Sequence, residues 1–216
     1  ALAGFGACYQ LLKDGFEVTL VDAAEAPGGL SRGWRTPKGR AVEAGIKGFW
    51  YHYFNIYNLI EELGIEDPFT DWTQSAFWDP SGIQVEAPVL QDLPRLPAPL
   101  GTLVYTNQYF RRLPAADRLT ALPLIPAMLS YDADAATYAD YDRMTARQLF
   151  RDTPGVSPRL YDEFLEPMLL VLMFAGGTEL SAAAALDVFY TYVLAHQPDF
   201  DVRWCKGSVS ERIFQP

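Results

Sequence analysis

The sequence contains few of the residues that build metal centres or disulfide scaffolds. Among 216 residues there are two cysteines, Cys8 and Cys205, and two histidines, His52 and His196. None belongs to a cluster with metal-ligand spacing, and the cysteines lie far apart, so a zinc site and a disulfide framework both lose support. We therefore expect a reducing compartment, no bound metal, and structural or surface roles for the histidines.

Basic residues and long apolar runs are also scarce. The chain has 17 Lys and Arg against 27 Asp and Glu, and a net charge of -10 repels a phosphate backbone. We therefore expect no nucleic-acid partner. The longest apolar run, 168–175, is shorter than the roughly 20 residues that span a bilayer. No targeting segment is recognisable, and a first residue other than Met suggests a cut N-terminus.

The composition indicates a folded chain, because 50% of the residues are hydrophobic and 14% are aromatic. At its start, apolar residues recur at near-helical spacing up to position 12, and Gly15 follows where a glycine ends a helix. Residues 17–22 then have the content of a buried parallel strand that ends in Asp22. Helix, glycine turn, strand and acid predict the later part of a βαβ unit.

The spacing around this helix indicates a dinucleotide site. Gly4 takes the place of the last glycine of the fingerprint, and Asp22, 18 residues later, takes the place of the acid that accepts ribose hydroxyls. Ala1 occupies the position of the second glycine, and the first glycine would precede the chain. The alternative is an ordinary helix glycine followed by a solvated acid.

Glycines downstream of Asp22 extend this pattern. Gly28 and Gly29 lack Cβ atoms, so their backbone can approach phosphate oxygens, although an ordinary turn would use the same residues. Arg32 can offer a guanidinium fork to a diphosphate or simply face solvent. Gly45 and Ile46 would let the backbone pass against a flat ring, and the alternative there is a plain β-turn.

Together these segments resemble the flavin amine oxidase and carotenoid desaturase superfamily. The similarity runs through 22–32 and 43–46, continues in the helix 55–65, and ends at the Lys-Gly-Ser turn 206–208, which is similar to the zeta-carotene type. Two positions depart from that pattern. Lys47 stands where plant-type desaturases commonly carry a histidine, and Leu30 where a basic residue often follows the glycine pair.

The resemblance implies an α/β fold with a Rossmann-like FAD-binding domain and a mixed α+β substrate domain. We expect a partial FAD domain over 1–72, a substrate domain over 73–205, and a segment returning to the FAD domain over 206–216. FAD is the implied cofactor, and no catalytic side chain is identified. The candidate cofactor-binding residues are Gly4, Asp22, Gly28, Gly29, Ser31, Arg32, Gly45 and Ile46.

The implied reaction is desaturation of a carotenoid, in which a hydride leaves an allylic carbon for flavin N5. The implied partners are a hydrophobic polyene substrate, a quinone or oxygen as electron acceptor, and a peripheral membrane contact. The implied location is a plastid for a plant or algal protein, and otherwise the cytoplasm. Alternatives on the same scaffold are a flavin amine oxidase, a carotene isomerase, and a cofactor-free prenyl-protein escort. An incomplete fragment that binds FAD poorly is a further possibility.

The remaining sequence predicts a helix over 55–63, a hairpin over 74–86 and, because prolines punctuate it, extended pieces and short helices over 87–126. Two apolar stretches, 96–104 and 119–129, would form either a lipid-facing mouth or packed core. They are flanked by Arg111, Arg112 and Arg118. Aromatic and Met residues of the later helices would line a polyene tunnel or pack in the core. They are Phe164, Met168, Met173, Phe174, Phe189, Tyr190 and Tyr192.

Overall fold

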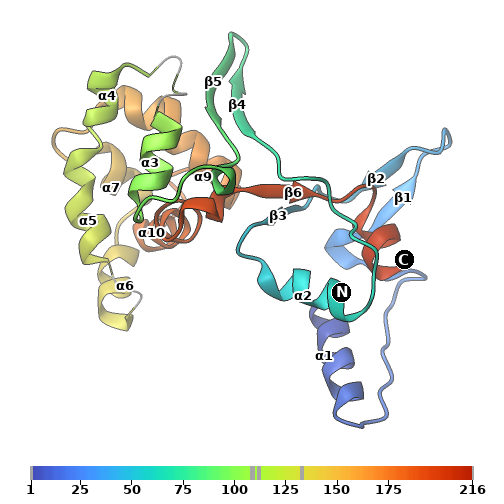
Figure 1. Cartoon of the computed structure of the whole chain (residues 1–216). Coiled ribbons are helices and arrows are strands. Elements are labelled where there is room, and N and C mark those ends of the chain that lie inside the picture. Colours follow the sequence, from blue (N-terminus) through green and yellow to red (C-terminus); the bar gives the residue numbers. More distant parts are fainter. Residues whose placement is uncertain (1, 108–109, 111–112, 132–133, 216) are drawn as a thin grey trace. The chain divides into compact units, whose positions relative to one another are not determined.

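The structure is a computed structural model that describes residues 2–107, 110, 113–131 and 134–215. The chain forms two compact units. The first unit contains residues 1–73 together with 202–216, and the second unit contains residues 74–201. The expected mixture of helices and strands is confirmed (Figure 1). Arg111 and Arg112, which were expected to flank an apolar mouth, lie outside the described residues.

The first unit contains short helices and strands contributed by both ends of the chain. β1 pairs antiparallel with β2, and β3 pairs antiparallel with β6, with Gly48 opposite Trp204. A 3-10 turn covers Gly29–Ser31 and a π-helical turn covers Ser210–Phe214. The regular elements are α1 (Leu2–Lys13), β1 (Gly33–Arg35), β2 (Ala41–Glu43), β3 (Gly48–Trp50), α2 (Phe54–Glu62) and β6 (Val202–Trp204).

Local signals predict the two helices of this unit correctly. α1 ends before Gly15, whose φ of 85° is the left-handed conformation that glycine adopts without steric cost. α2 lies within one residue of the expected bounds, buries Ile60, and is followed by Gly64 with a φ of 65°. The acidic pair at its end, Glu61 and Glu62, lies opposite the apolar face of the helix, where side chains are expected to be solvated. Both are exposed, and Glu62 forms an ion pair with Lys13 of α1.

The strand expected over 17–22 is wrong. The backbone there is irregular, and Leu20 and Val21 are 49% and 83% exposed. Within the described residues all strand pairs are antiparallel, and none of them includes 17–22. A strand is stabilised by hydrogen bonds to a neighbour, so apolar, β-branched content alone does not form one.

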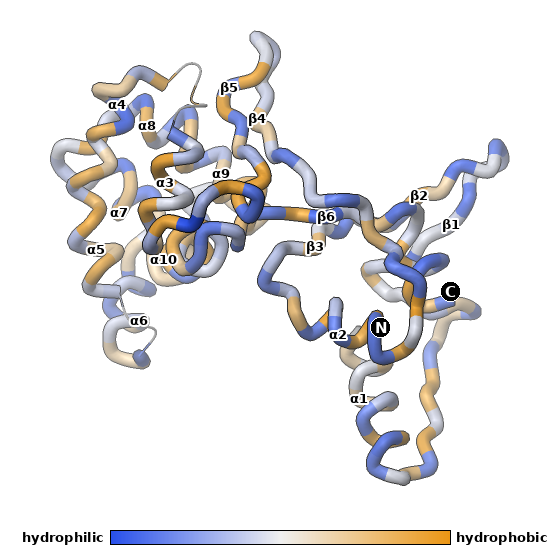
Figure 2. Tube along the Cα trace, viewed as in Figure 1, coloured by the Kyte–Doolittle hydropathy of each residue, from blue (hydrophilic) through white to orange (hydrophobic). Residues whose placement is uncertain are grey.

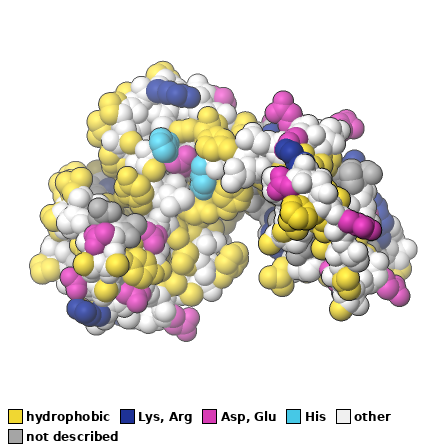
Figure 3. Space-filling view, turned by 90° about the horizontal axis from the view of Figure 1, so that it is seen from below, with side chains coloured by type: hydrophobic (Ala, Val, Ile, Leu, Met, Phe, Trp, Pro, Cys, Tyr) yellow, Lys and Arg dark blue, Asp and Glu magenta, His cyan; other side chains and the backbone are white. Residues whose placement is uncertain are grey.

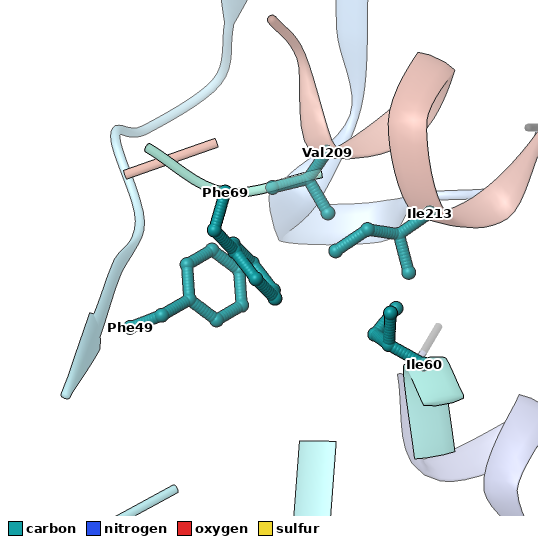
Figure 4. Close-up of a cluster of buried hydrophobic side chains, with 5 residues drawn as sticks. All are labelled: Phe49, Ile60, Phe69, Val209 and Ile213. Atoms are coloured by element: carbon teal, nitrogen blue, oxygen red, sulfur yellow. The ribbon is translucent and has the colours of Figure 1, made fainter. Parts of the chain in front are cut away.

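The core of the first unit joins distant parts of the sequence. Phe49 from β3, Ile60 from α2 and Phe69 pack with Val209 and Ile213 (Figure 4). The rings of Phe49 and Phe69 lie 4.5 Å apart between centroids. Because two of the five residues come from 202–215, which we call the return segment, this core forms only when the chain comes back after the second unit.

The second unit is mainly helical. The hairpin expected over 74–86 is confirmed, as are the short helices within 87–126. Its strands are β4 (Ser75–Asp79) and β5 (Gly82–Ala87). Its helices are α3 (Leu100–Asn107), α4 (Ala115–Leu119), α5 (Ile125–Ser130), α6 (Ala135–Asp142), α7 (Ala146–Arg151), α8 (Pro158–Leu160), α9 (Glu166–Met173) and α10 (Ala182–Phe189). Single turns cover Leu90–Asp92, Leu122–Leu124, Tyr161–Leu165, Tyr190–Leu194 and Gln197–Phe200.

Side-chain caps fix where three of these helices begin. Thr145, Ser157 and Ser181 each accept a backbone amide three residues ahead, at 3.1, 3.0 and 3.2 Å between donor and acceptor atoms. A Ser or Thr just before a helical run predicts an N-cap, and this prediction is confirmed at all three positions. A proline inside a helical run is expected to kink or divide the helix, which applies to Pro167. A π-helical turn over Tyr161–Leu165 separates α8 from α9 just before this proline.

The expected aromatic and Met stripe divides between interior and surface. Met168 and Phe189 are buried, and Phe189 packs edge-on against Phe150 at 5.4 Å between ring centroids. Phe174 and Tyr190 are exposed, whereas the remaining three are half-buried. The buried members therefore belong to the core of the second unit. Among the described helices, none is both long and apolar enough to cross a membrane.

Candidate functional site

The glycine loop, which comprises residues 28–32 of the first unit, has a conformation that requires glycine at position 28. Gly28 has a φ of 143°, and a Cβ atom there would lie 2.7 Å from the Cα of Arg32. The loop closes because the Ser31 amide donates to the Gly28 carbonyl at 2.9 Å, and the Arg32 amide donates to the Gly29 carbonyl at 3.1 Å. Ser31 is buried, whereas Gly29 and Arg32 are exposed. The loop thus presents backbone and a guanidinium group to solvent.

Asp22 and Gly4 lie upstream of this loop. The Asp22 carboxylate is exposed and accepts the Ala24 amide at 2.9 Å, which is a local turn contact. Gly4 lies on α1 beside Leu20, where an added Cβ would be 3.6 Å from the Cδ1 of Leu20, an ordinary contact distance. Packing in this structure therefore does not require glycine at position 4, unlike position 28.

The second predicted turn follows β2. Ile46 is 80% exposed, and the Lys47 ammonium donates to the Gly45 carbonyl at 3.0 Å. A Cβ on Gly45 would lie 3.2 Å from that ammonium nitrogen. Lys47 therefore folds back over the turn, at the position where the family pattern commonly has histidine.

The β1–β2 hairpin brings two of the predicted pieces together. The Ala44 amide donates to the Arg32 carbonyl at 2.9 Å, so the end of the glycine loop lies beside the start of the 44–46 turn. Among the hydrogen bonds of the described residues, none connects Gly4 or Asp22 to these two pieces. The structure thus assembles Arg32 and the Gly45 turn at one end of the hairpin.

Sequence reasoning missed the residues that anchor this hairpin. The Val209 amide donates to the Glu43 carboxylate at 2.5 Å, and the guanidinium of Arg35 donates to both oxygens of Glu211 at 2.7 and 2.9 Å. Gly33 packs directly on Ser208. These contacts join residues 166 to 176 positions apart, so no periodicity or spacing would have found them. The match at 206–208 was the only signal that this segment belongs beside the loop.

The remaining titratable candidates make local contacts. His196 Nδ1 lies 3.0 Å from a carboxylate oxygen of Asp199, three residues later, and the His52 ring packs edge-on against Tyr53. Both cysteines are free, and burial, aided by the charge of Glu43, raises the pKa of the Cys205 thiol to about 11. The described residues contain no group of three or more His, Cys, Asp or Glu side chains able to hold a metal ion.

A cavity of about 560 Å³ lies elsewhere in the first unit. It is lined by residues 63–68 after α2 and by Lys206, Glu211 and Arg212 of the return segment. None of the residues predicted to bind the cofactor lines it.

Helices α3 to α5 of the second unit contain hydrophobic residues (Figure 2), and several of their apolar side chains are exposed. The Arg118 guanidinium donates to the Asn107 side-chain oxygen at 2.6 Å, which ties α4 to the end of α3. We call this set the apolar surface: Leu100, Leu103, Val104, Leu119, Leu122, Ile125 and Leu129. Their exposure excludes the packed-core alternative for these seven within this structure. Hydrophobic side chains also reach the surface seen from below (Figure 3).

Comparison with known families identifies the class. Residues 2–203 match the flavin containing amine oxidoreductases, and the chain belongs to this family. Membership implies FAD as the cofactor.

Among curated proteins, the chain is 23% identical to the zeta-carotene desaturase of Synechocystis, and the match covers all of this chain and 44% of that protein. It is 27% identical to the 15-cis-phytoene desaturase of Narcissus pseudonarcissus and 26% identical to that of Arabidopsis thaliana. Each match covers all of this chain and 37% of the relative, and both relatives are named chloroplastic/chromoplastic. The chain thus spans less than half the length of these relatives.

The exposed groups of the first unit fit the chemistry of FAD. A diphosphate needs donors, which the bare backbone at Gly29 and the Arg32 guanidinium provide, and ribose hydroxyls need an acceptor, which the exposed Asp22 carboxylate provides. The turn at Gly45 and Ile46 offers exposed backbone and an apolar side chain for a flat ring.

Proposed function

We propose that the protein containing this chain is an FAD-dependent oxidoreductase that desaturates a carotenoid. The observation that carries this proposal is the family match over 2–203, combined with carotenoid desaturases among the relatives that match the whole chain. The Gly28 conformation supports it, because the residues just after that glycine display the donors that a diphosphate requires.

The residues of the first unit would hold the cofactor as follows. Gly28, Gly29, Ser31 and Arg32 form the loop that binds the diphosphate. In this loop exposed Gly29 and Arg32 supply the donors, and buried Gly28 and Ser31 fix the backbone. Asp22 accepts the ribose hydroxyls. Gly4 leaves room at the start of α1, and the turn at Gly45 and Ile46 lies against the ring system.

When bound, the flavin supplies the acceptor for a hydride leaving an allylic carbon of the polyene, while the neighbouring carbon loses a proton. The role of the chain is to orient the polyene and to exclude water, so no acid or base is assigned. A quinone or oxygen then removes the electrons. We expect the protein in a plastid if it comes from a plant or an alga, in line with the chloroplastic/chromoplastic names of the plant relatives, and otherwise in the cytoplasm.

The direct test is the visible spectrum of the full-length protein after reconstitution with FAD. We expect flavin bands, and we expect bleaching of these bands on anaerobic mixing with zeta-carotene or phytoene but not with simple amines. Bleaching by amines alone would favour an amine oxidase. Isomerised but not desaturated product would favour a carotene isomerase. A protein without flavin bands would favour the prenyl-protein escort.

Replacement of Asp22 tests the placement of the ribose. Asp22→Ala should weaken FAD binding by about 1–3 kcal/mol, the cost of leaving hydrogen-bonding groups without their acceptor. Glu25→Ala removes a nearby exposed carboxylate that has no proposed role and should leave the FAD affinity unchanged. Equal affinities of the two variants and the wild type would show that the ribose lies elsewhere.

We also propose that the apolar surface contacts the lipid from which the polyene is drawn. A hydrocarbon substrate stays in a membrane phase, and transfer of exposed Leu and Ile side chains from water into this phase lowers the free energy. The chain is acidic overall, so uncharged phosphatidylcholine vesicles are the suitable probe. Leu122→Glu with Leu129→Glu should abolish sedimentation with these vesicles. Val171→Glu, an exposed site on α9, is the control.

If the double variant sediments with the vesicles as well as the wild type and the Val171→Glu control do, the apolar surface contacts another partner, such as the rest of the protein.

A further inference from the structure

Glu43 bonds to a backbone group far away in the sequence. It is the last residue of β2 and half-buried, and its carboxylate accepts the amide of Val209 at 2.5 Å. Val209 is only 1% exposed and precedes the π-helical turn of the return segment. A buried amide without an acceptor is costly, so this carboxylate satisfies a donor that has little access to water.

The packing around Glu43 leaves little freedom. In the β1–β2 register, Gly33 lies opposite Glu43, and a Cβ on Gly33 would be 2.7 Å from the Cβ of Ser208. Ser208 is itself 1% exposed. The return segment therefore sits directly on the end of the hairpin, and the Glu43 side chain makes its polar connection there.

This connection lies next to the candidate flavin site. Glu43 immediately precedes the 44–46 turn, whose Ala44 amide is bonded to the carbonyl of Arg32. A shift of Glu43 would therefore move the turn and the end of the glycine loop together. Binding geometry that depends on positions within a fraction of an ångström is sensitive to such shifts.

We propose that Glu43 is a positioning residue, which fixes the 44–46 turn against the flavin by holding the return segment at Val209. This proposal rests on the proposed function, because it assumes that the turn contacts FAD. We assign Glu43 no direct contact with cofactor or substrate. Its effect passes through the backbone of β2 into the turn.

A second carboxylate provides a matched control. Glu211 bonds to Arg35 of the same hairpin, but the two side chains are 35% and 58% exposed. Exposed ion pairs of this kind contribute little, because water competes for both charges. Glu211→Ala therefore removes a carboxylate that also joins hairpin and return segment, but leaves the Val209 amide bonded to Glu43.

The experiment uses the full-length flavoprotein with Glu43→Ala, Glu43→Asp, Glu43→Gln or Glu211→Ala. The measurements are the dissociation constant for FAD, the visible circular dichroism of the bound flavin, and the thermal unfolding of the apoprotein. Glu43→Ala should raise the dissociation constant about tenfold, the effect of losing one hydrogen bond to a charged acceptor, and alter the flavin dichroism. Glu43→Gln retains an acceptor oxygen and should stay within about threefold of the wild type.

Glu43→Asp retracts the carboxylate and should show a reduced form of the same change, which tests the proposal even if Glu43→Ala does not fold. Wild-type affinity and dichroism in Glu43→Ala or Glu43→Asp would overturn the proposal, as would an equal loss in Glu211→Ala. A purely structural role would lower the unfolding temperature and leave the dichroism of the bound flavin unchanged. A wild-type protein that binds no FAD would instead reject the proposed function.

Discussion

The two units of this chain are stabilised in different ways. The first unit builds its core from residues 49–69 and 209–213, which are separated by the whole of the second unit. The second unit is continuous in sequence, and its buried contacts, such as that between Phe150 of α7 and Phe189 of α10, join residues of this one stretch. The first unit therefore depends on closure of the chain across the second unit, whereas the core of the second unit forms from 74–201 alone.

The strongest test of this difference is removal of a core ring from each unit. Phe69→Ala should cost about 3–5 kcal/mol, because the ring is 1% exposed and packs against Phe49 and Tyr57. Hydrogen exchange should then lose protection across 202–213 as well as around β3. The matched variant is Phe150→Ala, which should cost a similar amount but expose amides of α7 and α10. Loss of protection in both units from either variant would show that they unfold together.

A smaller effect is expected from a buried carboxylate at the end of the second unit. Asp201 accepts the amides of Leu90 and Gln91, at 2.7 and 2.9 Å, one with each oxygen. Asp201→Asn keeps the shape but has one acceptor oxygen, so one amide faces an NH2 group, and we expect a loss of about 1–3 kcal/mol. Chemical denaturation measures this loss. An equally stable variant would show that water satisfies the abandoned amide.

The helix cap at Thr145 tests how local the second unit is. Its hydroxyl accepts the Gln148 amide, and the Gln148 side chain accepts the Thr145 amide at 2.7 Å. Thr145→Ala should lower the free energy of unfolding by about 1 kcal/mol. Thr145→Ser keeps the hydroxyl and should therefore retain most of the stability that the cap provides. Exchange protection should fall in α7 and not in the first unit. A change confined to the first unit would contradict the local origin of this stability.

The smallest effect is a pH dependence of the first unit. Burial alone would raise the pKa of Asp67, but bonds from Arg203 and the Phe69 amide hold it below its ordinary value. Because the pKa is lower in the folded state, Asp67 stabilises this state at pH values above its pKa in the unfolded chain, which is about 4. This stabilisation is lost as the pH falls through the pKa of the folded state. Acid titration of Asp67→Asn should lack this component. An identical acid profile would show that the pair is screened by water.

The sequence predicts the parts of this fold that local chemistry decides. Gly15 and Gly64 end their helices, and Thr145 and Ser181 begin theirs, because the cap and the helix are neighbours in the chain. The strand over 17–22 failed for the opposite reason. It has suitable side chains, but a strand also needs a partner, and no neighbouring residue supplies one.

The candidate site divides in the same way. The glycine pair predicts a turn at 28–29, and the structure has one, with a φ at Gly28 that glycine adopts without strain. The bond from Val209 to Glu43 joins segments that approach each other only after folding, and neither residue carries a recognisable signal of its own.

The chain leaves the first unit and re-enters it at adjacent points, because Thr73 is bridged to Val202, with a 3.0 Å bond from the Thr73 amide to the Val202 carbonyl. The second unit is consequently an insertion whose two ends are already side by side. Evolution or a protein engineer can lengthen, shorten or exchange such an insertion without re-routing the host. During synthesis, the host has to wait for the entire insertion to leave the ribosome before its own interior closes.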